Sequence, residues 1–210
     1  ASQALSIFGD HQDVMSARMT GCVMLAAGSV QEVADLAPVS HLAAIKGRLP
    51  FINFFDGFRT SHEIQKIEVL DQEELAPLVD MEAVESFRKT AMNPDHPVTR
   101  GTAQNPDIYF QTREAVNKYY DDIPAVVEDY MAEITKLTGR EYHCFDYYGA
   151  KDADRVIVAM GSVIDVAEET VDYLNSKGEK VGLVKVRLYR PFSIERLLNT
   201  IPDTVKKIAV

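Results

Sequence analysis

Apolar and polar positions follow one another in the first part of the chain as expected for a strand, a helix and a second strand. An apolar run at residues 22–29 leads into a helical pattern at 29–47, and a second apolar run follows at 51–55. We interpret the second run as a strand buried on both faces of a sheet. A single helix between two such strands predicts that they lie parallel.

Local signals mark the ends of this first helix. Ser29 and Glu32 have the S-x-x-E spacing of a capping box, in which the side chain of each residue accepts a hydrogen bond from the backbone N–H of the other. Pro38 is expected to kink or divide the helix because it lacks an amide hydrogen. Gly47 is expected to end it.

Residues 154–210 repeat the alternation more regularly. The pattern predicts strands at 154–162, 179–192 and 204–210 and helices at 163–178 and 193–202. Gly178 is placed to end the first of these helices. Strands separated by single helices predict right-handed crossovers and a parallel sheet, so the predicted fold class is α/β.

The region between these stretches has a different character. Residues 71–89 predict two short acidic helices, and 113–139 a long helix that can break before Pro124. Between them, residues 93–111 contain three prolines without an apolar period, which predicts a long wrapping loop. Loops of that length are usually functional or linkers.

We place a domain boundary at residues 140–152, which gives domains of 1–140 and 141–210. The chain opens without Met and closes on an apolar strand. An unpaired apolar strand is an unusual natural terminus because it invites pairing. We therefore expect a segment of a longer polypeptide.

Composition excludes several classes of function. The 210 residues are 46% hydrophobic and carry a formal net charge of −10, which disfavours nucleic acid and anionic membranes as partners. No apolar run reaches the roughly 18 residues of a membrane span. Cys22 and Cys144 lie far apart without a C-x-x-C pair, so no zinc or iron–sulfur ligand run is present. A reduced, cytoplasmic protein is expected.

The stretch G-D-H-Q-D near the start offers two carboxylates and an imidazole. We interpret Asp10 or His11 as the cap of a helix that begins near Gln12. The alternative is a site for anionic groups of a substrate or cofactor, which helix starts favour. A metal site is disfavoured because a third or fourth convergent ligand is missing.

A second candidate stretch follows the predicted strand at 51–55. The H-E-x-x-H zinc motif is broken because its last position is Lys66, and the capping-box spacing of Thr60 and Glu63 predicts a helix start instead. Ligands of open α/β sheets bind beyond the carboxyl ends of strands. The candidate pocket residues are Asp56, Arg59, Ser61 and His62.

Other motifs are missing. The glycine-rich signatures of dinucleotide and triphosphate sites are absent, as is the G-x-S-x-G of hydrolases. Arg187 and Arg190 flank the end of an apolar strand, and we expect them on a solvated or inter-domain face.

Four longer stretches carry a resemblance to a known family: ALSIFGDHQDVMSARMTG, FINFFDGFRTSHEIQKIEVLD, NPDHPVTRGTAQNPDIYFQTRE and ADRVIVAMGS with GEKVGLVKVRLYRPFS. Together they resemble the pyruvate:ferredoxin oxidoreductases, or pyruvate synthases, along essentially the whole chain. The resemblance implies large multidomain enzymes that use thiamine diphosphate, Mg²⁺ and 4Fe-4S clusters. They decarboxylate pyruvate oxidatively, form acetyl-CoA from coenzyme A, and pass electrons to ferredoxin or flavodoxin.

The resemblance also implies a fold and a place for the segment. Residues 1–140 would form part of a parallel-sheet, pyrimidine-type thiamine-diphosphate-binding domain, and 141–210 the first half of a transketolase C-terminal-like domain. The family's catalytic glutamate, its pyruvate ligands, its magnesium site and its cluster cysteines would all lie outside this chain. The implied partners are the rest of the polypeptide and a second copy in a homodimer.

No residue of the segment is therefore expected to be catalytic or to bind a metal. Gly9, Asp10 and His11 are expected to form a wall of the cofactor site. Two other hypotheses remain open: a related 2-oxoacid:ferredoxin oxidoreductase with another substrate, and a non-catalytic assembly module when the segment is isolated.

Overall fold

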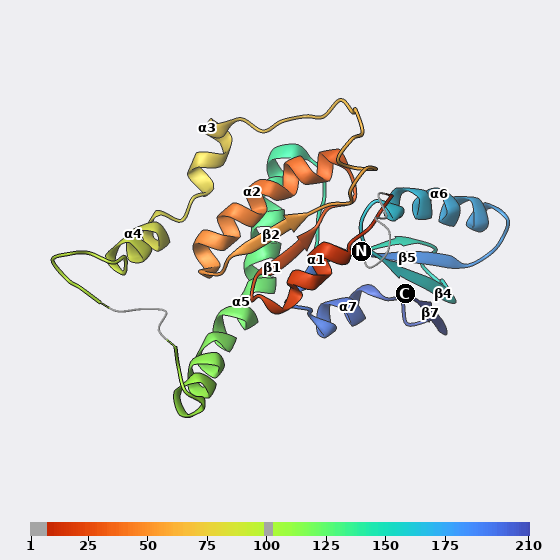
Figure 1. Ribbon diagram of the computed structural model, residues 1–210. Helices are drawn as coiled ribbons and strands as arrows, with labels where there is room; N and C mark the ends of the chain where they lie inside the picture. The colour runs from red at the N-terminus through yellow and green to blue at the C-terminus, as the bar shows by residue number, and fades with distance from the viewer. Residues whose placement is uncertain (1–7, 99–102) are drawn as a thin grey trace.

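The computed structural model describes residues 8–98 and 103–210, and its strands form two sheets (Figure 1). The first sheet has the order β2 (Phe51–Phe54), β1 (Val23–Ala26), β6 (Leu188–Arg190). The second has the order β3 (Phe145–Gly149), β5 (Val181–Val186), β4 (Arg155–Ala159), β7 (Lys207–Ala209). The predicted α/β class is confirmed in its general form.

The helices lie between and around these strands. They are α1 (Gln12–Ser16), α2 (Val30–Gly47), α3 (Gln72–Leu75), α4 (Met81–Lys89), α5 (Pro106–Thr138), α6 (Val163–Ser176) and α7 (Ile194–Thr200). Short 3₁₀ turns follow α1 and α3. The two acidic helices predicted within residues 71–89 are confirmed as α3 and α4.

The two sheets are mixed, which corrects the expectation of parallel sheets. β1 runs parallel to β2, and β4 runs parallel to β5 and β7. In contrast, β6 is antiparallel to β1, and β3 is antiparallel to β5. The expected single strand at 179–192 is split between the sheets, because the chain leaves β5 through Arg187 and enters β6 without turning back. No crossover helix follows β5, so β6 does not return to pair in the same sheet.

Strand β1 is the centre of the first sheet because both of its faces are covered. Val23 and Leu25 face the core formed with α2 and α5, whereas Met24 and Ala26 face Phe54 and α1. All four β1 residues are buried. This explains why the strand is apolar at every position rather than alternating.

Helix α2 begins as predicted but does not break. The Ser29 hydroxyl accepts the Glu32 amide at 3.2 Å, and the Glu32 carboxylate accepts the Gly28 amide at 2.7 Å, one residue before the expected partner. The expected division at Pro38 is wrong, since α2 is continuous to Gly47. Packing of its buried face against the first sheet and α5 outweighs the hydrogen bond that proline removes.

Helix α5 is longer than predicted at its start and runs through Pro124 without a break. It begins at Pro106, so residues 106–111 of the expected wrapping loop are helical; proline is well accommodated at a first helical position. The buried residues of α5 lie in its second half, from Ile123 to Ile134. Figure 1 shows its first half projecting away from the sheets, whereas α4 lies beside α2.

The helix expected to begin at Thr60 does not form. Residues 63–70 run as an irregular strap, fastened where the Gln31 side-chain amide bonds the backbone N–H and C=O of Glu68 at 2.8 and 2.9 Å. Arg140 also donates to the Glu68 carboxylate at 2.6 Å. These long-range bonds fix the strap at Glu68 and take the place there of the local bonds that a helix would provide.

Arg187 is buried where the two sheets meet, so the expectation of a solvated face is wrong for it, whereas the alternative of an inter-domain face stays a prediction. Its side chain is 3% exposed. One terminal nitrogen is 2.7 Å from Glu32 of α2, and the other contacts Asp146 of β3. Arg190 is half-buried and donates to the carbonyl of Arg18.

Candidate functional site

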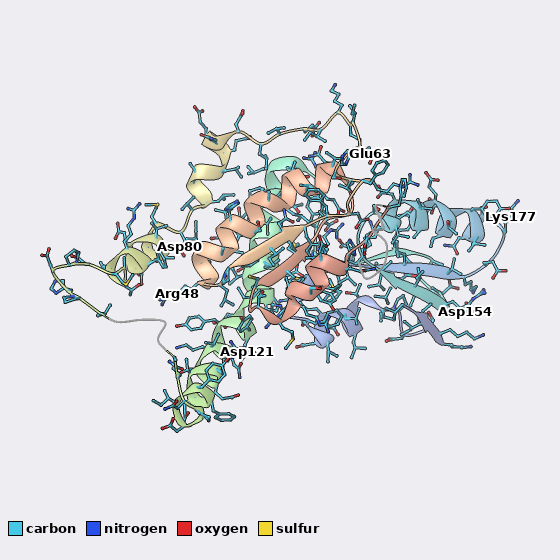
Figure 2. The ribbon with its side chains drawn as sticks, viewed as in Figure 1. Arg48, Glu63, Asp80, Asp121, Asp154 and Lys177 are labelled. Atoms are coloured by element: carbon cyan, nitrogen blue, oxygen red, sulfur yellow. The ribbon has the colours of Figure 1, made fainter. Side chains whose placement is uncertain are left out.

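The carboxyl ends of three strands from the two sheets converge on one pocket of about 840 Å³. Gly28 follows β1, Asp56 follows β2, and Ser162 follows β4. Such ends are where ligands bind in open α/β sheets. The pocket is lined by Phe8, Gly9, His11, Gly28, Asp56, Phe58, Arg59, His62, Glu63, Met160, Ser162, Val163, Asp165 and Val166. Figure 2 shows Glu63 where the first part of the chain approaches α6.

A buried carboxylate and an imidazole form the polar centre of this pocket. Asp56 is 2% exposed, and its Oδ1 contacts His11 Nε2. The other oxygen, Oδ2, accepts the Ser162 amide at 2.7 Å, at the start of α6. The His11 ring also meets Phe54 edge-on at 5.5 Å between centroids. His11, Asp56 and the β4–α6 turn thus form one contacting unit, in which the link between Asp56 and the Ser162 amide is a hydrogen bond.

Glycine is required where the backbone of the β4–α6 turn passes this unit. Gly161 has a φ of +86°, and a Cβ built there would lie 2.6 Å from Asp56 Oδ1 and 2.7 Å from His11 Cε1. A Cβ at Gly28 would in turn lie 3.1 Å from the Gly161 carbonyl oxygen. The two strand–helix turns are therefore in close backbone contact at the floor of the pocket.

Aromatic side chains and one guanidinium form the rim. The Phe8 and Phe58 rings are 4.6 Å apart, His62 stacks on Phe58 at 5.4 Å, and Arg59 lies over Phe8 at 5.8 Å. Phe58 has a φ of +59°, which is strained for a bulky side chain. Strained residues of this kind cluster at ligand sites, which supports a functional role for the rim.

The structure brings most of the predicted site residues together. Those that line the pocket are Gly9, His11, Asp56, Arg59 and His62. Asp10 instead accepts the Gln12 amide at 2.9 Å just before α1. The N-cap residue of α1 is His11, whose side chain makes no capping hydrogen bond. Ser61 is not a lining residue; its hydroxyl accepts the Phe58 amide and bonds His62 Nδ1.

Sequence reasoning missed the residues that come from the turns after β1 and β4. A usable signal was present, because the two strands end in the similar strings A-A-G-S and A-M-G-S. The rule that ligands bind beyond strand carboxyl ends, applied only after residues 51–55, would have included Gly28, Gly161 and Ser162.

Three carboxylates make the pocket acidic. Asp56 is paired with His11, whereas Glu63 and Asp165 lie nearer the surface. The pKa of Asp165 is raised from its ordinary value, first by burial and then by the negative charges of Glu32 and Glu168. The pocket therefore favours groups that are cationic, neutral or able to donate hydrogen bonds.

This acidity gives a pH-dependent prediction for Asp165. Because its folded-state pKa is raised, ionisation opposes folding above that pKa, and the penalty disappears as pH falls toward the ordinary value near 3.8. We expect Asp165→Asn to stabilise the protein at pH 7 by less than about 1 kcal/mol, since the group is partly screened by solvent. Thermal unfolding followed from pH 7 downward measures the effect, which should shrink as the pH falls through the folded-state pKa toward the ordinary value.

The matched control is Asp152→Asn. The pKa of Asp152 is lowered by its bond to Lys180, so the same neutral replacement should give the opposite sign at pH 7. A melting temperature that falls in Asp165→Asn would contradict the acidic character assigned to the pocket.

Within residues 8–98 and 103–210, no group of three or more His, Cys, Asp or Glu side chains is arranged to hold a metal ion. Burial raises the pKa of the Cys144 thiol, and the nearby Glu128 raises it further. Cys22 is also a free thiol. No helix in the described part of the chain is both long and apolar enough to cross a membrane.

Two family models match the chain, and the segment matched by each contributes residues to the pocket. Residues 1–132 match the model described as pyruvate flavodoxin/ferredoxin oxidoreductase, thiamine diphosphate-binding. Residues 153–210 match the model described as pyruvate:ferredoxin oxidoreductase core domain II.

Curated relatives and a solved structure agree with these matches. The chain is 66% identical to pyruvate-flavodoxin oxidoreductase of Enterobacter agglomerans and 62% identical to pyruvate:ferredoxin oxidoreductase of Moorella thermoacetica. Both matches cover all 210 residues but only 18% of those relatives' length. The fold is similar to 2-oxoglutarate:ferredoxin oxidoreductase from Magnetococcus marinus, with a TM-score of 0.59, 16% identity, and coverage of 99% of this chain and 38% of that one.

The matched thiamine diphosphate-binding model spans more than half of the chain and contributes His11 and Asp56 to the pocket. The second model contributes Ser162 and Asp165. On these matches, the chain belongs to the pyruvate flavodoxin/ferredoxin oxidoreductase family.

Proposed function

We propose that this chain is one part of a longer polypeptide that decarboxylates pyruvate oxidatively with coenzyme A, forming acetyl-CoA and CO₂. Electrons would pass through iron–sulfur clusters to ferredoxin or flavodoxin. The observation that carries the proposal is that both family-matched segments place residues in the same pocket, at the carboxyl ends of β1, β2 and β4. Thiamine diphosphate supplies the electron sink for decarboxylation when it is bound.

The lining fits the ring portion of thiamine diphosphate better than its diphosphate. The Phe8–Phe58 pair offers aromatic surface, and Glu63 and Asp165 favour a cationic ring. Arg59 is the one Lys or Arg among the described lining residues. We therefore propose that Gly9, His11 and Asp56 form a wall beside the cofactor rings, with Arg59 and His62 at the mouth near pyruvate.

The described residues do not fit the magnesium ion or the 4Fe-4S clusters. Magnesium prefers several convergent oxygen ligands and the clusters need four cysteine thiolates, and the described residues offer neither set. We propose that other parts of the polypeptide hold these groups. In this proposal the segment binds and orients the cofactor rings and excludes water at one wall of the site.

Finer features of the assembly follow the same proposal. Residues 1–140 would form part of a pyrimidine-type thiamine domain, and 141–210 the start of a transketolase C-terminal-like domain. The enzyme would be a cytoplasmic homodimer whose segment makes no contact with nucleic acid or membrane.

An assay of the full-length polypeptide tests this function. We expect pyruvate-dependent reduction of a viologen dye that requires coenzyme A and thiamine diphosphate, together with the broad visible absorbance of iron–sulfur clusters. 2-Oxoglutarate replaces pyruvate in the control reaction and should give far slower reduction.

Two results would count against the proposal. Faster reduction with 2-oxoglutarate would identify a related 2-oxoacid oxidoreductase, with the same fold and a different substrate. A colourless protein without dye reduction would leave a non-catalytic assembly role.

A further inference from the structure

We infer that Asp56 is a positioning residue: it fixes the His11 imidazole in the pocket wall, and the β4–α6 turn completes the arrangement through Gly161 and Ser162. This inference rests on the proposed function for the identity of the reaction. It adds the claim that the segment matched to core domain II helps to build the pocket of the thiamine diphosphate-binding segment.

The Asp56 carboxylate has both oxygens engaged in directions that fix its plane. Oδ2 accepts the Ser162 amide at 2.7 Å, and Oδ1 contacts His11 Nε2. With the carboxylate 2% exposed, water offers little competition for either oxygen. A carboxylate held against one imidazole nitrogen restricts the orientation of the ring.

His11 has no rigid element of its own that could hold its ring. It precedes α1, a helix of five residues without a buried side chain. Its side chain is 19% exposed, and its contacts are Asp56, the edge of Phe54 and the backbone at Gly161. Removing the carboxylate therefore frees the ring to rotate in the pocket.

Gly161 supplies an independent way to disturb the same pair. A methyl group there would overlap both Asp56 Oδ1 and His11 Cε1, because a Cβ would lie under 3 Å from each. Gly178 is its matched control: its φ is +88°, against +86° for Gly161, and a Cβ there meets nothing within 4 Å. Both alanine variants place a side chain at a positive φ, but only Gly161→Ala puts a methyl group against Asp56 and His11.

The experiment compares Asp56→Asn, Gly161→Ala and Gly178→Ala in the full-length enzyme. Carbethoxylation of His11 by diethyl pyrocarbonate is followed by peptide mass spectrometry and normalised to His143, which lies outside this pocket. Pyruvate kcat and KM are measured on the same samples. Circular dichroism and elution volume check that each variant is folded.

We expect His11 to react severalfold faster in Asp56→Asn and in Gly161→Ala, and at the wild-type rate in Gly178→Ala. We also expect kcat/KM to fall by about tenfold or more in the first two variants, since a misplacement of about 1 Å away from the reacting atoms can cost on the order of a hundredfold. Gly161→Ala keeps the Asp56 carboxylate, so it tests the position of the His11 ring separately from the charge of Asp56.

Unchanged His11 reactivity in both variants would overturn the inference, because Asp56 would not hold the ring. Faster His11 modification with unchanged kcat/KM would also overturn it, because the position would have no consequence for turnover. If the wild-type enzyme lacks pyruvate-dependent turnover, the proposed function fails, while the His11 reactivities still show whether Asp56 holds the imidazole.

Discussion

Arg187→Ala is expected to destabilise the junction between the two sheets by about 3–5 kcal/mol, the cost of removing one partner from a buried ion pair. The truncation leaves the Glu32 and Asp146 carboxylates facing each other with their cation gone. It also removes the guanidinium from the face of the Tyr142 ring, 5.1 Å away. The effect should extend to the pocket, because the same Glu32 carboxylate accepts the Gly28 amide.

Hydrogen exchange in the full-length protein measures this effect locally. Peptides spanning residues 183–190 should exchange at least about a hundredfold faster, since every 1.4 kcal/mol is a factor of ten. Arg155→Ala is the matched control, because Arg155 pairs with Asp154 and Glu179 on the surface and should change little. Equal effects from the two variants would show that burial of Arg187 contributes nothing.

Ile123→Ala is expected to cost about 2–5 kcal/mol, because the side chain is fully buried where α5 enters the core. Its Cδ1 fills the space over Gly47 at the end of α2, where a Cβ on the glycine would lie 2.5 Å away. Truncation therefore leaves a cavity between the two helices that pack on β1.

Ile108→Ala provides the comparison on the same helix, because Ile108 is 55% exposed. Hydrogen exchange of peptides from α2 and β1 should accelerate in Ile123→Ala and stay near wild type in Ile108→Ala. A large effect of Ile108→Ala in the full-length enzyme would mean that the projecting half of α5 is covered there, contrary to the expectation of an exposed surface.

The sequence predicted the elements whose signals are local. Ser29 marked the start of α2, and the apolar runs marked β1 and β2. The division at Pro38 and the break before Pro124 do not occur for the same reason: both prolines lie in helices held by tertiary packing, which outweighs a single lost hydrogen bond. The capping-box spacing at Thr60 did not lead to a helix, because the Gln31 side chain bonds the backbone of Glu68 in the strap that follows.

The pocket was predicted in pieces but not as a unit. His11 and Asp56 each belonged to a separate candidate stretch, and their contact depends on the Ser162 amide more than 100 residues further along the chain. The pairing of β6 with β1 could not be predicted from the sequence pattern either. β6 follows β5 directly, without the helix that the strand–helix repeat leads one to expect, and it pairs antiparallel with β1. Long-range pairing is the information that a single sequence carries least explicitly.

The late arrival of β6 has a consequence for synthesis on the ribosome. Leu25 pairs with Leu188, so β1 is made about 160 residues before its second neighbour exists. At roughly 5–20 residues per second, this edge of β1 stays unpaired for on the order of ten to thirty seconds. During that time the nascent chain presents an apolar strand edge to any other chain nearby, which is the condition that chaperones relieve. Slower translation of residues 145–190 would lengthen that exposure and lower the yield of soluble enzyme.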